Sequence, residues 1–124
     1  MFDTGTLIYT KLSTDSMLLS LVGSTDHIVA SHPETITVFP LVIFRELDQV
    51  DVEFCDDLPI GSNSTYVVDV YVKEDTPTPI SIAVCNIFKG IYWACNYNSD
   101  VPDPDALVRH RVMHFTRPLL SSDL

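Results

Sequence analysis

Apolar residues near the start of the chain recur every three or four positions, which is the spacing of an α-helix. Leu7, Ile8 and Leu12 fall on one such stripe, and the polar run 13–16 interrupts it before a second short apolar group. Gly23 follows, and glycine readily takes the left-handed conformation that ends many helices. The pattern therefore predicts two short helices with a bend between them.

Further along the chain, the apolar positions follow the shorter period of β-strands. The segment 49–55 shows this period most clearly, because Val50, Val52 and Phe54 alternate with acidic residues. Pro40 lacks the backbone N–H that a strand ladder uses, so we expect it at the beginning of its strand or on an edge. Strands are expected at 27–30, 39–44, 49–55, 65–72, 92–97 and 107–115, with turns or loops at 57–64 and 98–105 and with Arg117 and Pro118 ending the last strand.

A longer helix is predicted between the later strands. Pro77 and Pro79 suit its first turn, and Gly90 marks its end. The order helix–helix–strands–helix–strands predicts an α+β fold, in which a mainly antiparallel β-sheet has the N-terminal helices and one longer helix packed on one face. The length of 124 residues fits a single domain, 1–124. The apolar stripe of the longer helix consists of Ile80, Val84, Ile87, Phe88 and Ile91.

The chain is acidic, with 17 Asp and Glu against 7 Lys and Arg and a formal net charge of −10. A protein that binds DNA regardless of sequence needs cationic side chains to displace counterions from the phosphates, and few are present here. The hydrophobic content of 46% is sufficient for a buried core and argues against global disorder. We therefore expect a folded protein that does not hold nucleic acid tightly.

The three cysteines, Cys55, Cys85 and Cys95, are an odd number and form no C-x-x-C pair. This usage favours reduced thiols in a protein made in the cytoplasm, with the cysteines acting as small buried hydrophobes. The residues 1–3 carry no basic segment of the kind that begins a secretory leader. No apolar run approaches the roughly 20 residues of a membrane span, so a soluble protein is expected.

His110 and His114 are four residues apart, a spacing that on a helix brings two ligands to one zinc ion. The alternation around them predicts a strand instead, in which such residues are about 13 Å apart. The acidic segment 46–57 lacks the glycine-containing pattern of a calcium loop, and the serines lack the G-x-S-x-G motif. No catalytic, cofactor-binding or metal-binding residue is therefore predicted, and the chain is not expected to be an enzyme.

Six segments fall in a distinctive order along almost the whole chain: 7–23, 27–29, 39–44, 66–72 with Asp69 inside it, 80–91 and 109–115. In this order and spacing the chain resembles the family of tail-completion or tail-terminator proteins of long-tailed bacteriophages and prophages. The resemblance implies an α+β fold, assembly into a ring that is commonly a hexamer, and a role in capping the tail tube and joining it to the DNA-filled head. It also implies a virion protein assembled in the host cytoplasm. Its partners would be the major tail tube protein and the head-completion or connector proteins, and DNA would pass through the ring without specific binding.

Charged residues suggest how such a ring would close. A closed ring joins one patch of each subunit to a different patch of its neighbour. Arg109, Arg111 and Arg117 lie on one basic strand, Asp51 and Glu53 lie on an acidic hairpin, and we predict that the two groups pair between subunits. Acidic residues are expected at the lumen, because negative charge keeps passing DNA from adhering.

Three other functions stay open at this point. One is a head-completion or adaptor subunit on the portal side of the connector. Another is a small hydrolase that uses the acidic hairpin or the histidines. The third is a generic ligand-binding α+β domain, which would need a deep and partly polar cavity.

Overall fold

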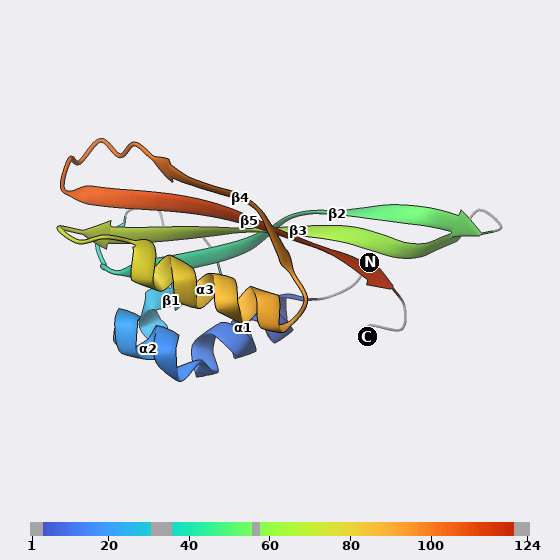
Figure 1. Ribbon diagram of the computed structural model, residues 1–124, viewed down its shortest axis with the longest axis horizontal. Helices are drawn as coiled ribbons and strands as arrows, with labels where there is room; N and C mark the ends of the chain where they lie inside the picture. The colour runs from blue at the N-terminus through green and yellow to red at the C-terminus, as the bar shows by residue number, and fades with distance from the viewer. Residues whose placement is uncertain (1–3, 31–35, 56–57, 121–124) are drawn as a thin grey trace.

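The computed structural model describes residues 4–30, 36–55 and 58–120, and for 48–62 and 118–120 it describes the backbone alone. The helices and strands follow one another as the sequence predicts, helices first, then strands, a helix and strands (Figure 1). Their bounds are α1 Gly5–Thr14, α2 Ser16–Val22, the 3-10 turn η1 Thr25–His27, β1 Ile28–Val29, β2 Leu41–Cys55, β3 Leu58–Lys73, α3 Thr78–Gly90, β4 Ala94–Val101 and β5 Val108–Leu120.

The strands form one five-stranded sheet in the order β1-β2-β3-β5-β4. The short β1 runs parallel to β2, and the other neighbouring pairs are antiparallel. All three α-helices lie on the same side of this sheet (Figure 1). The predicted α+β fold, with a mainly antiparallel sheet and helices on one face, is confirmed.

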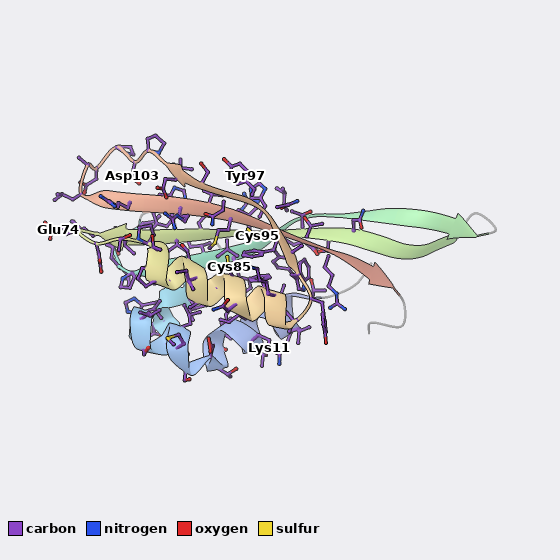
Figure 2. All side chains as sticks on the ribbon, in the orientation of Figure 1. Lys11, Glu74, Cys85, Cys95, Tyr97 and Asp103 are labelled. Atoms are coloured by element: carbon purple, nitrogen blue, oxygen red, sulfur yellow. The ribbon has the colours of Figure 1, made fainter. Side chains whose placement is uncertain are left out.

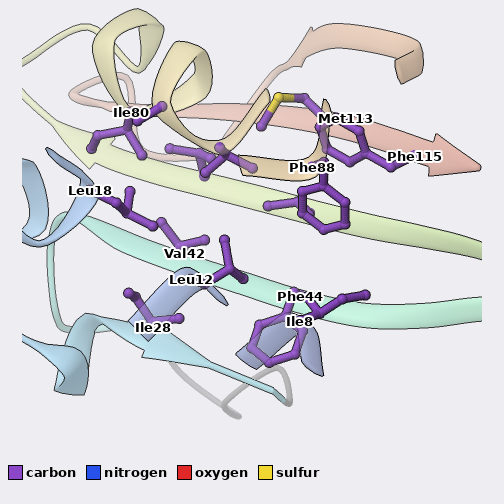
Figure 3. Close-up of a cluster of buried hydrophobic side chains, with 14 of the residues drawn as sticks. Ile8, Leu12, Leu18, Ile28, Val42, Phe44, Ile80, Phe88, Met113 and Phe115 are labelled. Carbon is purple, nitrogen blue, oxygen red and sulfur yellow. The ribbon is translucent and has the colours of Figure 1, made fainter. Parts of the chain in front are cut away.

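The main core lies between the helices and the sheet (Figure 3). Ile8 and Leu12 of α1 are almost fully buried in it, as the helical stripe predicts. The rings of Phe88 on α3 and Phe115 on β5 stack with their centroids 4.1 Å apart. Each apolar side chain of this size stabilises the fold by roughly 1.5–3 kcal/mol when it is fully buried. This layer therefore fixes α1 and α3 against the centre of the sheet.

A smaller apolar cluster lies on the opposite face of the sheet. Successive side chains of a strand point to opposite faces, so Leu41 and Ile43 turn away from the helices. They are buried against Tyr71, with Ile36 and Phe39 packed beside them. Because both faces of β2 are covered here, the segment 39–44 is almost wholly apolar instead of alternating.

The first helix differs from expectation in one detail. Leu7 is 45% exposed, so it lies outside the core even though the helical spacing places it on one stripe with Ile8 and Leu12. Only one side of each short helix contacts the sheet, so an apolar residue at the margin of that side stays partly exposed. Thr4 precedes α1 but its side chain does not cap the helix. Its Oγ1 instead lies 2.8 Å from the hydroxyl of Tyr66, a buried hydrogen bond.

β2 and β3 are longer than predicted, whereas β1, Ile28–Val29, is shorter than the predicted strand at 27–30. β2 is one strand of 15 residues with a register shift between Glu46 and Asp48, where two separate strands were expected. The predicted turn at 57–64 is wrong, because Leu58–Lys73 is a single strand. Ser62, for example, pairs with Asp51 on one side and with Leu119 on the other. Backbone pairing on both sides therefore outweighs the local preference of Gly, Ser and Asn for turns.

The last two strands also exceed their predicted ends. β4 continues to Val101, into the expected loop, and β5 continues to Leu120, past the residue that was expected to end it. β4 pairs with β5 only as far as Thr116, so Pro118 lies where β5 has lost that neighbour. A proline is tolerated at such an edge, because its missing N–H has no ladder partner to lose.

Candidate functional site

The most distinctive feature is a long β-hairpin that extends beyond the helices (Figure 1). It consists of the segments 48–55 of β2 and 58–65 of β3, which pair from Asp48 with Thr65 to Cys55 with Leu58. We call these two segments the projecting hairpin. Asp51 and Glu53 belong to it, but their side chains lie outside the described part of the chain. Their pairing with a neighbouring subunit remains a prediction.

Two of the predicted interface arginines lie at the other end of the sheet. Arg109 is registered opposite Val72 on β3, whereas Asp51 is registered opposite Ser62 on the same strand. Ten residues of strand separate these two positions, which is roughly 33 Å at about 3.3 Å per residue. Arg109 and the projecting hairpin therefore occupy opposite ends of one molecule.

Arg111 is already bound within its own chain. Its Nε donates to Oδ1 of Asp100 at 2.9 Å, and its Nη1 donates to Oγ1 of Thr78 at 3.4 Å. The hydrogen bond from Arg111 lowers the pKa of Asp100, and the charges of Arg111 and Arg109 lower it further. Arg111 thus joins β4 and β5 to the start of α3, a role that the sequence does not reveal.

Arg117 lies apart from the other two arginines. It is registered opposite Ser64, at the base of the projecting hairpin. Its Nη1 donates to the carbonyl oxygen of Ile91 at 3.2 Å, and its guanidinium lies 5.8 Å from the ring centre of Tyr92. The three arginines of β5 therefore do not form one continuous basic patch, although they share a strand.

A buried polar pair lies on the sheet face that the helices leave uncovered. His110 Nε2 is 2.7 Å from Oδ1 of Asp69, and the His110 ring stacks on Tyr71 with the centroids 4.0 Å apart. Burial raises the pKa of Tyr71 to about 12, and the negative charges of Asp69 and Asp103 add to the effect. The Tyr71 hydroxyl therefore keeps its proton at neutral pH and above.

The two histidines of β5 are separate, as predicted for a strand. His110 is bound to Asp69, whereas His114 packs against Tyr97, with ring centroids 4.7 Å apart. Over the residues that the structure describes, no group of three or more potential ligands is arranged to hold a metal ion. Across the same residues, no helix combines the length and apolarity needed to cross a membrane.

An open hollow of about 510 Å³ lies beside His110, between the end of β4 and the start of β5. Three aspartates contribute to its lining, and Arg109 is the one arginine or lysine among the described lining residues. The hollow is wide and shallow, unlike the deep and mostly apolar cavity that a small-molecule site requires. Its lining residues are Asp100, Val101, Pro102, Asp103, Asp105, Ala106, Val108, Arg109 and His110.

Comparison with proteins of known structure gives a likeness over nearly the whole chain. One similar chain belongs to the solved structure "Virion of native gene transfer agent (GTA) particle", with a TM-score of 0.66. The likeness covers 92% of this chain and 92% of that chain at 13% sequence identity. The two chains share a fold. No family model matches the sequence, and no curated protein matches it either.

Proposed function

We propose that this chain is a structural virion protein of a phage-like particle. In this proposal it forms a closed ring at the top of the tail tube, ends the tail and joins it to the DNA-filled head. The observation that carries the proposal is the shared fold with a chain of a gene transfer agent virion, which extends over 92% of both chains. The order of hydrophobic segments, which resembles tail-completion proteins, supports the same assignment.

The shape of the subunit supports head-to-tail assembly. A ring of identical subunits needs two different patches whose contact repeats and closes. The projecting hairpin, with Asp51 and Glu53, lies at one end of the sheet, and Arg109 lies at the other. Within one molecule these groups are too far apart to pair. A hairpin that reaches the opposite end of the next copy brings the acidic and basic residues together.

The arginines contribute unequally in this arrangement. Arg109 is exposed and is available to a neighbour's carboxylates. Arg111 is a weaker candidate for the contact with a neighbouring subunit, because it already donates to Asp100. Arg117 lies beside the hairpin of its own subunit and donates to Ile91. Arg109 is therefore the leading candidate for the contact with Asp51 or Glu53.

The net negative charge of the chain is also compatible with a ring lumen through which DNA passes. The net charge of −10 gives the chain a surplus of carboxylates, which repel phosphates if they line a lumen. A subunit that only conducts DNA needs no set of phosphate-binding cations. We expect acidic residues to face the lumen, and a ring with a basic lumen would contradict this part of the proposal.

The test is assembly of the purified chain, followed by native mass spectrometry and electron microscopy. A closed ring is expected, and Arg109→Glu should prevent it. Lys89→Glu is the matched control, because it makes the same change of charge at an exposed position on α3. Restoration of rings by mixing Arg109→Glu with an Asp51→Arg, Glu53→Arg variant supports the contact. Rings that form equally well with Arg109→Glu contradict it.

Binding to isolated particle parts separates the tail role from its alternative. A subunit that ends the tail should bind purified tails that lack heads. Binding to DNA-filled heads alone would favour the head-completion or adaptor role. A hydrolase would instead lose turnover in Glu53→Ala and His114→Ala variants, and a bound metal or such a turnover would overturn the structural role.

A further inference from the structure

Two cysteines, one on a helix and one on a strand, pack against the same core residues. Cys85 lies on α3, and its Sγ is 3.7 Å from Sδ of Met113. Cys95 lies on β4, registered opposite Phe115, which shares the helix-facing side of β5 with Met113. Both cysteines pack against the same core cluster, and Figure 2 places them side by side between the helix and the sheet.

Both side chains contact the same core cluster, and they are near enough for Cys95 to affect the ionisation of Cys85. Burial raises the pKa of Cys85, and the neighbouring Cys95 raises it further. Neither cysteine is fully buried, in contrast to the prediction of inert buried hydrophobes. Both cysteines are therefore partly exposed to solvent.

We propose that Cys85 and Cys95 are a redox-active pair, which forms an intramolecular disulfide between α3 and β4 when the protein meets a small disulfide oxidant such as oxidised glutathione. The inference concerns this chain's own thiols and does not rest on the proposed function. Reduced cysteines, as expected during synthesis in a cytoplasm, are the starting state of the reaction.

Cys95 makes the first attack. Its Sγ donates to the carbonyl oxygen of Tyr97 at 3.3 Å in exposed surroundings on an outer strand, whereas the Sγ of Cys85 contacts Sδ of the buried Met113. The Cys95 thiolate forms a bond to one sulfur of oxidised glutathione, the glutathione disulfide breaks, and one glutathione leaves as a thiolate. This step produces a mixed disulfide on Cys95.

Cys85 then resolves the mixed disulfide. It gives its proton to solvent, and its thiolate attacks the Cys95 sulfur and displaces the second glutathione. Two protein thiols are oxidised, one glutathione disulfide is reduced to two thiols, and the two protons from the cysteines end on the glutathiones. The raised pKa of Cys85 suits the resolving role, because less of this thiol is in the thiolate form and its attack on the nearby Cys95 sulfur is intramolecular.

The bond would tie an outer strand to the helix layer. β4 pairs with β5 on one side, and Cys95 lies near the end of β4 that follows Trp93. A crosslink to α3 removes the freedom of the connecting segment in the unfolded chain, so the oxidised protein should unfold at a higher temperature than the reduced one.

The experiment treats the full reduced chain with oxidised glutathione and maps its peptides by mass spectrometry without reduction. The expected product is a peptide pair joined through Cys85 and Cys95, with the loss of two hydrogen atoms. The melting temperature should rise by several degrees on oxidation and return to its original value after reduction with dithiothreitol. The same linked peptide should form in Cys55→Ser, which is the matched control because it removes the remaining cysteine.

Cys85→Ser and Cys95→Ser should each abolish the linked peptide. Peptide mapping of the wild type and of Cys55→Ser decides the proposal even if a serine variant fails to fold. A disulfide through Cys55, a stable mixed disulfide at Cys95 that Cys85 never resolves, or free thiols at both positions after treatment would overturn it.

Discussion

His110 Nε2 and Asp69 Oδ1 lie 2.7 Å apart across neighbouring strands β5 and β3, on the sheet face opposite the helices. Their side chains are only 13% and 11% exposed. A buried polar group that loses its partner costs about 1–3 kcal/mol, so this pair constrains how β3 and β5 can be aligned. A shift of one residue between β3 and β5 would place the two side chains on opposite faces of the sheet.

Removal of one partner should therefore destabilise the fold. Asp69→Ala is expected to lower the free energy of unfolding by about 1–3 kcal/mol, because His110 is left without its hydrogen-bond partner. Urea unfolding measures the change. Asp26→Ala, at an exposed position, should have little effect. In a double-mutant cycle with His110→Ala, a coupling energy close to zero would show that the pair contributes nothing.

The two leucines of α1 offer a matched test of the core. Leu12 is fully buried and Leu7 is 45% exposed on the same helix. Leu12→Ala should cost about 2–5 kcal/mol, since it removes apolar contacts and leaves a cavity. The identical change at Leu7 should cost about 0.5 kcal/mol or less, because this side chain is already exposed to solvent in the folded protein. Equal losses in thermal or urea unfolding would contradict the position of α1.

Tyr71 should make stability fall at high pH. Its pKa is about 12 in the folded protein against an ordinary value of 10.0. The folded state therefore holds a proton that the unfolded state loses, and stability is complete below pH 10.0 and declines as the pH rises towards about 12. The free energy of unfolding, measured across this pH interval, should decline less steeply in Tyr71→Phe. A spectroscopic titration should also lose its most alkaline tyrosine step in that variant.

The Arg111–Asp100 contact predicts which of two arginine substitutions changes the pKa of Asp100 more. The hydrogen bond from Arg111 lowers the pKa of Asp100 below 3.8, and the charge of Arg109 has a smaller influence. Arg111→Gln should therefore raise this pKa more than Arg109→Gln, as measured by NMR titration of the carboxyl carbon. A larger rise with Arg109→Gln would contradict the geometry.

The same contact should add little to stability. Its contribution is present above pH 3.8 and is lost as the pH falls below it, because protonation removes the negative charge. The Asp100 side chain is 70% exposed, so solvent screening keeps the contribution under about 1 kcal/mol. An Asp100→Asn variant should accordingly unfold at nearly the wild-type temperature at neutral pH.

Much of the fold can be predicted from local patterns. Helical spacing finds Ile8, Leu12 and the stripe of α3, and Gly23 ends α2 with φ 101°, a conformation in which glycine is favoured. These features depend on residues close together in the sequence, where a period or a single backbone preference decides the outcome.

The candidate site could be predicted only in part, because its contacts depend on register. His110 and Asp69 are 41 residues apart, and no local pattern shows that they meet. Arg117 was grouped with Arg109 because both lie on one strand, yet Arg117 lies opposite Ser64 at the base of the projecting hairpin and Arg109 lies at the other end of that strand. An acidic hairpin was predicted, but its length was missed because Gly61 and Ser62 favour turns, whereas pairing with two neighbouring strands holds them extended.

The edge strand β4 affects how the protein behaves in concentrated solution. β4 pairs with β5 on one side, and in the part of the chain that the structure describes no strand pairs with its other side. Its eight residues include no proline and no lysine, the two residues that commonly block such an edge. A concentrated solution of this protein is therefore prone to strand-to-strand polymerisation through β4.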